Sequence, residues 1–167
     1  MLFAIVLLAG YALTWLLPRR RVTAADRWRL ALALGMTVAG VAHLVDPTPF
    51  VQHLPEWVPQ REPLVLLTGL IEIGLGLALL APQPYRRLVG LLVAAYLVAV
   101  FPGNIYVAVA GVEVDGQPGG VYPWLRLLFQ PLFIWLAVWC TRPLARRNEP
   151  TGNDRAERRG DKAGVTA

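Results

Sequence analysis

An apolar run bounded by two prolines most constrains what this chain can fold into. Between Pro63 and Pro82 lie 18 residues, of which Glu72 is the only charged one. As a helix, a run of this length crosses the core of a lipid bilayer. Glu72 would then lie roughly 13 Å from the start of the run, near the bilayer midplane. Because a carboxyl group is costly at that depth, the run predicts either a polar site inside a helix bundle or a glutamate that serves only helix packing.

The remaining apolar stretches extend this interpretation to the whole chain. Of the 167 residues 56% are hydrophobic, which is typical of a small polytopic membrane protein and leaves room for one bundle. The further predicted spans are 1–17, 30–45, 88–109 and 124–141. The sequence therefore predicts an all-α fold with five transmembrane helices. A four-span alternative, in which residues 1–17 are peripheral, keeps the other spans unchanged.

The distribution of basic residues predicts the orientation. If the spans alternate, 14 of the 16 Lys and Arg residues fall on the side of the C-terminal tail, whereas Arg61 lies opposite and Arg126 lies inside a span. This asymmetry predicts a multi-pass protein of the inner (plasma) membrane with its N-terminus outside and its C-terminus in the cytoplasm. Residues 142–167 are charged and poor in apolar side chains, so we expect a disordered cytoplasmic tail. Basic residues that flank spans do not form a nucleic-acid-binding face, so nucleic acid is not an expected partner.

Several other classes of function are disfavoured by the sequence. The single cysteine, Cys140, excludes an internal disulfide or a CxxC redox pair. The cysteine and the two histidines do not have the spacing of a metal site. A transporter is a weaker reading because the chain shows neither inverted repeats nor two broken helices in matching halves.

Polar residues inside the spans define a candidate site. With the predicted topology, His43, Asn104 and Arg126 lie in the outer third of the membrane, and Gln130 lies one helical turn deeper than Arg126. Arg126 can pair inward with Glu72 or snorkel to the outer headgroups. The predicted ligand-binding residues, which face a small pocket open to the outer side, are His43, Thr68, Glu72, Asn104, Arg126 and Gln130.

Two local expectations concern the surroundings of this pocket. Pro102 should kink its helix, and with Gly103 and Asn104 it predicts an irregular outer third of that span. His53 lies in a proline-rich loop, where we expect a solvated side chain rather than a ligand.

Four segments in chain order resemble the DoxX-like family of membrane proteins. The segment Gly40–Phe50 is similar to the first core helix of that family and the loop after it, and Thr68–Leu77 is similar to its second helix. Phe101–Tyr106 resembles the FPxNI segment of its third helix, and Leu125–Gln130 resembles the start of its fourth. The resemblance covers roughly residues 30–139.

The resemblance implies a four-helix transmembrane bundle over residues 27–141, with residues 1–17 as an extra N-terminal transmembrane helix. Some relatives in the family are subunits of quinone-linked redox complexes, and others act with redox-protein partners. The expected function is an accessory subunit of a membrane redox process, without independent enzyme activity or an intrinsic cofactor, that binds a quinone or another small amphipathic ligand. The alternative is a non-catalytic assembly module whose buried polar residues only fix helix packing.

Overall fold

The computed structural model describes residues 2–17 and 22–142, and every regular element in these ranges is a helix. The predicted all-α fold is therefore confirmed. The elements in order are α1 (Leu2–Leu13), the 3₁₀ turn η1 (Thr14–Leu16), α2 (Ala24–Val45), α3 (Thr48–Val51), α4 (Arg61–Ala78), α5 (Gln83–Ala110) and α6 (Tyr122–Cys140). The predicted tail lies outside the described residues except for Arg142, as do the basic residues 19–21.

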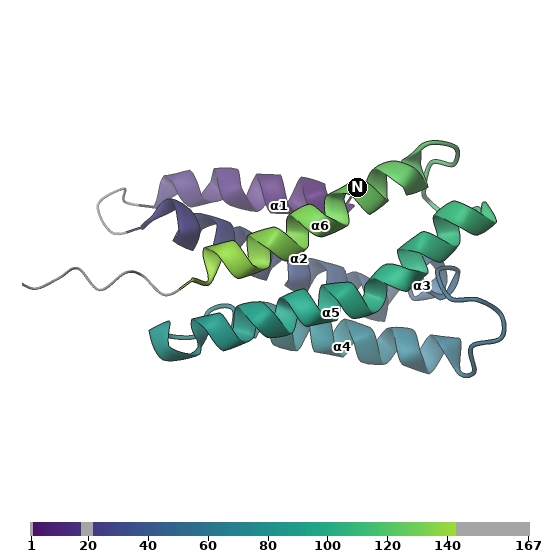
Figure 1. The fold of residues 1–167 in the computed structure, drawn as a ribbon, viewed down its shortest axis with the longest axis horizontal. Helices are drawn as coiled ribbons and strands as arrows, with labels where there is room; N and C mark the ends of the chain where they lie inside the picture. Colours follow the sequence, from purple (N-terminus) through teal and green to yellow (C-terminus); the bar gives the residue numbers. More distant parts are fainter. Residues whose placement is uncertain (1, 18–21, 143–167) are drawn as a thin grey trace, which may run out of the picture.

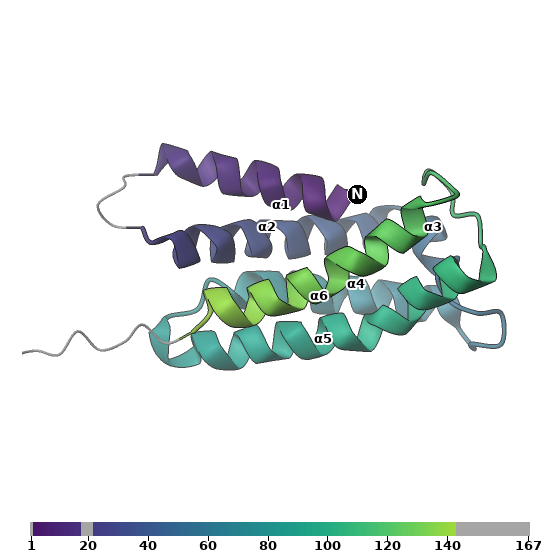
Figure 2. The same cartoon turned by 45° about the horizontal axis from the view of Figure 1, so that its top comes forward.

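The long helices run side by side along one axis (Figures 1 and 2). The central helix is α2, which packs along α1 and α4 and also touches α6, whereas α5 packs mainly along α6. By contrast, α4 and α5 meet at few positions. The start of α2, the α4–α5 turn and the end of α6 lie together at one end of the molecule, called here the basic end (Figure 1). The opposite end, where α3 and the α5–α6 loop lie, is called the α3 end.

Three of the described helices, α2, α5 and α6, are long and apolar enough to cross a membrane. The helix α4 has 18 residues and begins two residues before Pro63, so it contains the charged residues Arg61 and Glu62 in addition to Glu72. Proline is tolerated in a first helical turn, where its missing N–H has no partner to lose. The α1 and η1 segment forms a shorter apolar helix over residues 3–16.

Local side-chain chemistry explains where α2 begins and ends. The Thr23 hydroxyl accepts a hydrogen bond from the Asp26 backbone N–H at 3.1 Å, and the Asp26 carboxylate accepts one in return from the Thr23 backbone N–H. This capping box satisfies two donors that a helix start leaves unpaired. Asp46, extended before Pro47, ends the helix because a residue before proline is disfavoured in the α region.

The α2–α4 contact depends on glycines. A Cβ atom at Gly40 would lie 2.5 Å from the carbonyl oxygen of Gly69, and one at Gly69 would lie 2.7 Å from Cβ of His43. A Cβ atom at Gly76 would lie 2.5 Å from the hydroxyl oxygen of Thr37. The two backbones therefore approach each other more closely than any larger residue would permit.

The expected irregular region after Pro102 is not present. The α5 helix continues through this proline to Ala110 and ends at Gly111, which has a φ of 64°. A proline removes one backbone donor and kinks a helix, but the flanking turns can continue on both sides. Gly103 allows α5 to approach the α3–α4 loop closely, because a Cβ atom there would lie 3.2 Å from the carbonyl oxygen of His53.

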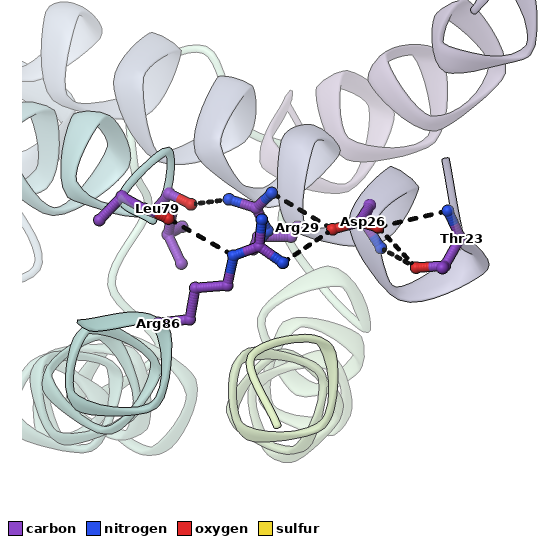
Figure 3. Close-up of polar contacts among 6 residues, drawn as sticks. Thr23, Asp26, Arg29, Leu79 and Arg86 are labelled. Carbon is purple, nitrogen blue, oxygen red and sulfur yellow. Dashed lines mark hydrogen bonds and ion pairs between the residues drawn. The ribbon is translucent and has the colours of Figure 1, made fainter. Parts of the chain in front are cut away.

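A cluster of polar contacts lies at the basic end (Figure 3). The carboxylate of Asp26 lies 3.3 Å from Arg29 and 3.1 Å from Arg86, so one side chain of α2 pairs with two guanidinium groups. Arg29 also donates to the carbonyl of Leu79, which ties the start of α2 to the α4–α5 turn. Next to this cluster, a buried apolar core fills the half of the molecule toward the basic end, with members from α1, α2, the α4–α5 turn, α5 and α6.

Candidate functional site

All six predicted site residues line one cavity of about 1090 Å³ at the α3 end. The cavity lies between the α2–α4 pair and the α5–α6 pair, where the sparse contact between α4 and α5 leaves space. Its wall is mostly apolar, and the prolines and aromatic residues of the α2–α4 connection contribute to it. A concave apolar wall with a few convergent polar groups is typical of a small-molecule site.

Glu72 and His43 form the polar centre on the α2–α4 side. His43 Nδ1 lies 3.2 Å from Oε2 of Glu72 and 2.8 Å from the carbonyl oxygen of Ala39. A carbonyl can only accept, so Nδ1 carries a proton that it donates to Ala39, and Oε2 of Glu72 is a buried oxygen without a hydrogen bond. The ring of His43 stacks on Phe50, with centroids 3.7 Å apart, which fixes its orientation.

Thr68 and Tyr96 lie beside this centre. The hydroxyl of Thr68 donates to the carbonyl of Val65 in its own helix at 2.8 Å, so its hydrogen-bonding proton is already used. The hydroxyl of Tyr96, from α5, reaches the carbonyl of Thr68 at 3.4 Å and also interacts with Glu72. Tyr96 was not predicted from the sequence because a tyrosine within an apolar helix gives no signal that separates a site from a core.

Asn104 and Gln130 join α5 to α6 on the other side of the cavity. Both side chains are buried, and the Asn104 amide donates to the Gln130 side-chain carbonyl at 3.4 Å. The Gln130 amide in turn donates to the backbone carbonyl of Leu97 at 2.7 Å. Leu97 precedes Val98, whose carbonyl lacks its helical donor because of Pro102. The two amides therefore join α6 to the part of α5 that contains Pro102 and the unpaired carbonyl of Val98.

Arg126 does not form the expected direct pair with Glu72. Its Nη1 donates to Nε2 of His53 at 2.6 Å and to the side-chain carbonyl of Gln117 at 3.1 Å. A direct pair with Glu72 is not among the ion pairs of the described residues, although the two charges interact. Arg126 therefore joins the two loops of the α3 end.

The prediction that His53 is solvated is wrong. Only 7% of this residue is exposed, and its Nδ1 donates to the carbonyl of Pro49 at 2.7 Å while its Nε2 accepts from Arg126. A second connection between the same loops lies nearby, where Gln52 donates to the Asp115 carboxylate at 2.7 Å and accepts from the Asp115 backbone N–H at 2.8 Å. Sequence spacing could not find these pairs, because their members lie far apart in the chain.

The protonation of His53 predicts how stability depends on pH. Burial, together with the nearby positive charge of Arg126, lowers the pKa of His53 from 6.5 to about 4. Between these values the unfolded chain binds a proton that the folded chain does not, so stability is full above pH 6.5 and falls as the pH decreases toward 4. We expect this group to account for a loss on the order of 2 kcal/mol, measured as the unfolding free energy in detergent.

A His53→Gln variant provides the control for this prediction. Glutamine retains an acceptor for Arg126 but does not titrate, so the decrease between pH 6.5 and 5 should become shallower than in the wild type. The Glu113→Gln variant, at an exposed loop position, should keep the wild-type slope. Identical slopes in all three proteins would contradict the assignment of a neutral, buried His53.

Among the described residues, no group of three or more His, Cys, Asp and Glu side chains is arranged to hold a metal ion. The polar groups around the cavity are suited to hydrogen bonding, and they include carboxyl groups, amides, hydroxyls, two imidazoles and a guanidinium group.

The comparisons with known proteins place the chain in a family. Residues 30–141, two-thirds of the chain, match the model of a domain of unknown function, DUF8561. The chain belongs to the DUF8561 family. The DUF8561 region begins within α2 and ends directly after α6. It contains every residue of the cavity wall except Phe3 and Ala4, which belong to α1. Neither the curated proteins nor the solved structures include a match to the chain.

Proposed function

We propose that this chain is a DoxX-like inner-membrane protein that holds a small amphipathic molecule of the quinone type, as an accessory subunit of a membrane redox process. One observation carries the proposal: six polar residues from four helices, chosen from the sequence, surround a single cavity with a mostly apolar wall. An amphipathic molecule matches such a wall, because its apolar part contacts the wall and its polar head meets the few polar groups.

The proposed membrane arrangement is a four-helix bundle of α2, α4, α5 and α6 with α1 as an additional N-terminal helix. In support, α2, α5 and α6 are long and apolar enough to span, and α4 holds its one central charged residue, Glu72, toward the protein interior. The basic end carries Arg27, Arg29, Arg86 and Arg87, which favours this end as the cytoplasmic one. The cavity would then lie in the outer half of the bundle.

The quinone-linked part of the proposal rests on the resemblance of the four polar segments to DoxX-like proteins. The cavity supports a binding role rather than independent catalysis, since its polar groups can position a headgroup and exchange protons with it. Electron transfer would then require a redox-protein partner in the membrane, which the proposal includes.

Mass spectrometry of the organic extract from protein purified in mild detergent tests this function. We expect the wild type to retain a quinone-type molecule in stoichiometric amount and Glu72→Gln to lose it, because the variant removes the carboxylate at the polar centre. Glu62→Gln is the matched control, since it makes the same change on the same helix at an exposed position outside the cavity. Bulk phospholipid as the sole extract of all three proteins would refute the proposal.

A second candidate function is an assembly module, and a specific observation favours it. Asn104, Gln130, Arg126 and His53 all find partners within the protein, as polar residues would if they only fixed helix packing. Under this alternative, Glu72→Gln would leave both the composition of the organic extract and the capture of a protein partner unchanged. The reason is that a glutamine side chain can also form hydrogen bonds with the neighbouring helices.

A further inference from the structure

Glu72 differs from the other polar residues of the cavity because one of its two carboxyl oxygens, Oε2, is buried and has no hydrogen-bond partner among the described residues. Only 7% of the residue is exposed, and its Oε2 is buried without a hydrogen bond. The nearest nitrogen, His43 Nδ1 at 3.2 Å, has its proton directed to the carbonyl of Ala39. A buried oxygen without a donor is unfavourable, so such a group in a cavity points to a ligand that supplies the donor.

Several donors around the cavity are engaged with other acceptors. The Tyr96 hydroxyl has one proton, and the carbonyl of Thr68 competes with Glu72 for it. The Asn104 amide donates to Gln130, and Arg126 Nη1 donates to His53 and Gln117. Oε2 of Glu72 is therefore an acceptor of the cavity residues that none of these donors reaches.

The position of Glu72 allows a ligand to reach it. The residue lies near the middle of α4 and lines the cavity together with Thr68 and Ile71 of the same helix. The terminal torsion of a glutamate side chain is soft and nearly two-fold, so a rotation exchanges its two oxygens at little cost. Either oxygen can thus accept from a group within the cavity.

We propose that the cavity selects a ligand whose head donates a hydroxyl hydrogen bond to Glu72, and so binds the reduced hydroquinone in preference to the oxidised quinone. This inference rests on the function proposed above and specifies the form of its ligand. A quinone carbonyl only accepts, so it would place a second acceptor against the carboxylate, whereas a hydroquinone hydroxyl supplies the missing donor. The adjacent apolar wall suits the alkyl chain of either form.

Three matched probes test the inference under anaerobic conditions: a decyl-substituted benzohydroquinone, the corresponding benzoquinone, and the dimethyl ether of the hydroquinone. The ether has the shape of the hydroquinone but donates no hydrogen bond and has no redox activity. We expect detergent-purified wild-type protein to bind the hydroquinone about tenfold or more tightly than either other probe, as one additional hydrogen bond to a buried acceptor would give. In Glu72→Gln the preference should fall to about threefold or less, because the amide also donates to a carbonyl, and Glu62→Gln should retain the full preference.

Each outcome decides between the inference and the function on which it rests. Equal or tighter binding of the quinone or the ether by the wild type overturns the inference but leaves a quinone-type site in place. No binding of any probe overturns both. A wild-type preference that persists in Glu72→Gln overturns the assignment to Glu72. The wild-type comparison with the ether stands even if the variant does not fold, because it requires no substitution.

Discussion

Alanine at Gly69 is expected to destabilise the protein by about 1–3 kcal/mol, because it forces α2 and α4 apart. The new Cβ would lie 2.7 Å from Cβ of His43 and 2.9 Å from the carbonyl oxygen of Gly40. Neither neighbour is a flexible side-chain end, so a helix must shift. Gly40→Ala should cost at least as much, since its Cβ would meet the carbonyl oxygen of Gly69 at 2.5 Å and the backbone nitrogen of Ile73 at 2.9 Å. The unfolding free energy in detergent measures both effects.

Gly74→Ala is the matched control on the same helix. A Cβ atom there has no neighbour within 4 Å, so alanine should leave stability unchanged or raise it by up to about 1 kcal/mol through helix propensity. Equal unfolding free energies for Gly69→Ala and Gly74→Ala would show that α2 and α4 do not approach as described. Because Gly69 lies one turn before Glu72, its variant should also weaken retention of any ligand that meets the carboxylate.

Asp26→Asn is expected to lower the unfolding free energy by about 2–3 kcal/mol, because it removes the negative charge between two arginines. The Arg29 side chain is 8% exposed and its Nε has no hydrogen-bond partner, so its charge depends on Asp26 at 3.3 Å and on the carbonyl of Leu79. Arg86 loses its 3.1 Å partner at the same time. Asparagine retains an acceptor for the Thr23 cap, which limits the loss to the ion pairs.

A double-mutant cycle separates these ion pairs from the cap. If Asp26 and Arg86 interact as Figure 3 shows, Asp26→Asn should cost less in an Arg86→Gln background than in the wild type. Glu113→Gln, an exposed acidic residue in the α5–α6 loop, should have no measurable effect. Full additivity of the two substitutions would contradict the ion pair.

The sequence by itself determined the all-α class, the long apolar helices and the choice of polar residues. Apolar length located the long helices, although α2 and α5 each begin several residues before the predicted spans at 30 and 88. The six candidate residues were found as polar groups in apolar spans, since the cost of burying them makes an interior position the expected one. Depth along the predicted spans was enough to place them near one another.

The consequences of Pro102 were less predictable. Its sequence context suggested irregular backbone, but α5 stays helical through Pro102, and Gln130 of α6 donates to the carbonyl of Leu97, next to the Val98 carbonyl that the proline leaves without a helical donor. A local pattern cannot report a hydrogen bond supplied by a residue 33 positions away. The effect of a helix-breaking residue therefore depends on what packs against it.

Only the tertiary structure decided which polar groups meet. His53 and Arg126 are separated by 73 positions, Gln52 and Asp115 by 63, and Arg29 and Leu79 by 50, yet each pair is joined by a hydrogen bond. Periodicity reports which face of a helix is apolar, but the partner of a polar side chain depends on how loops and helices from distant segments come together. For this reason, the sequence identified Arg126 and Glu72 as interior polar residues, but only the fold shows that Arg126 bonds to His53 and that Glu72 lines the cavity without a direct pair to Arg126.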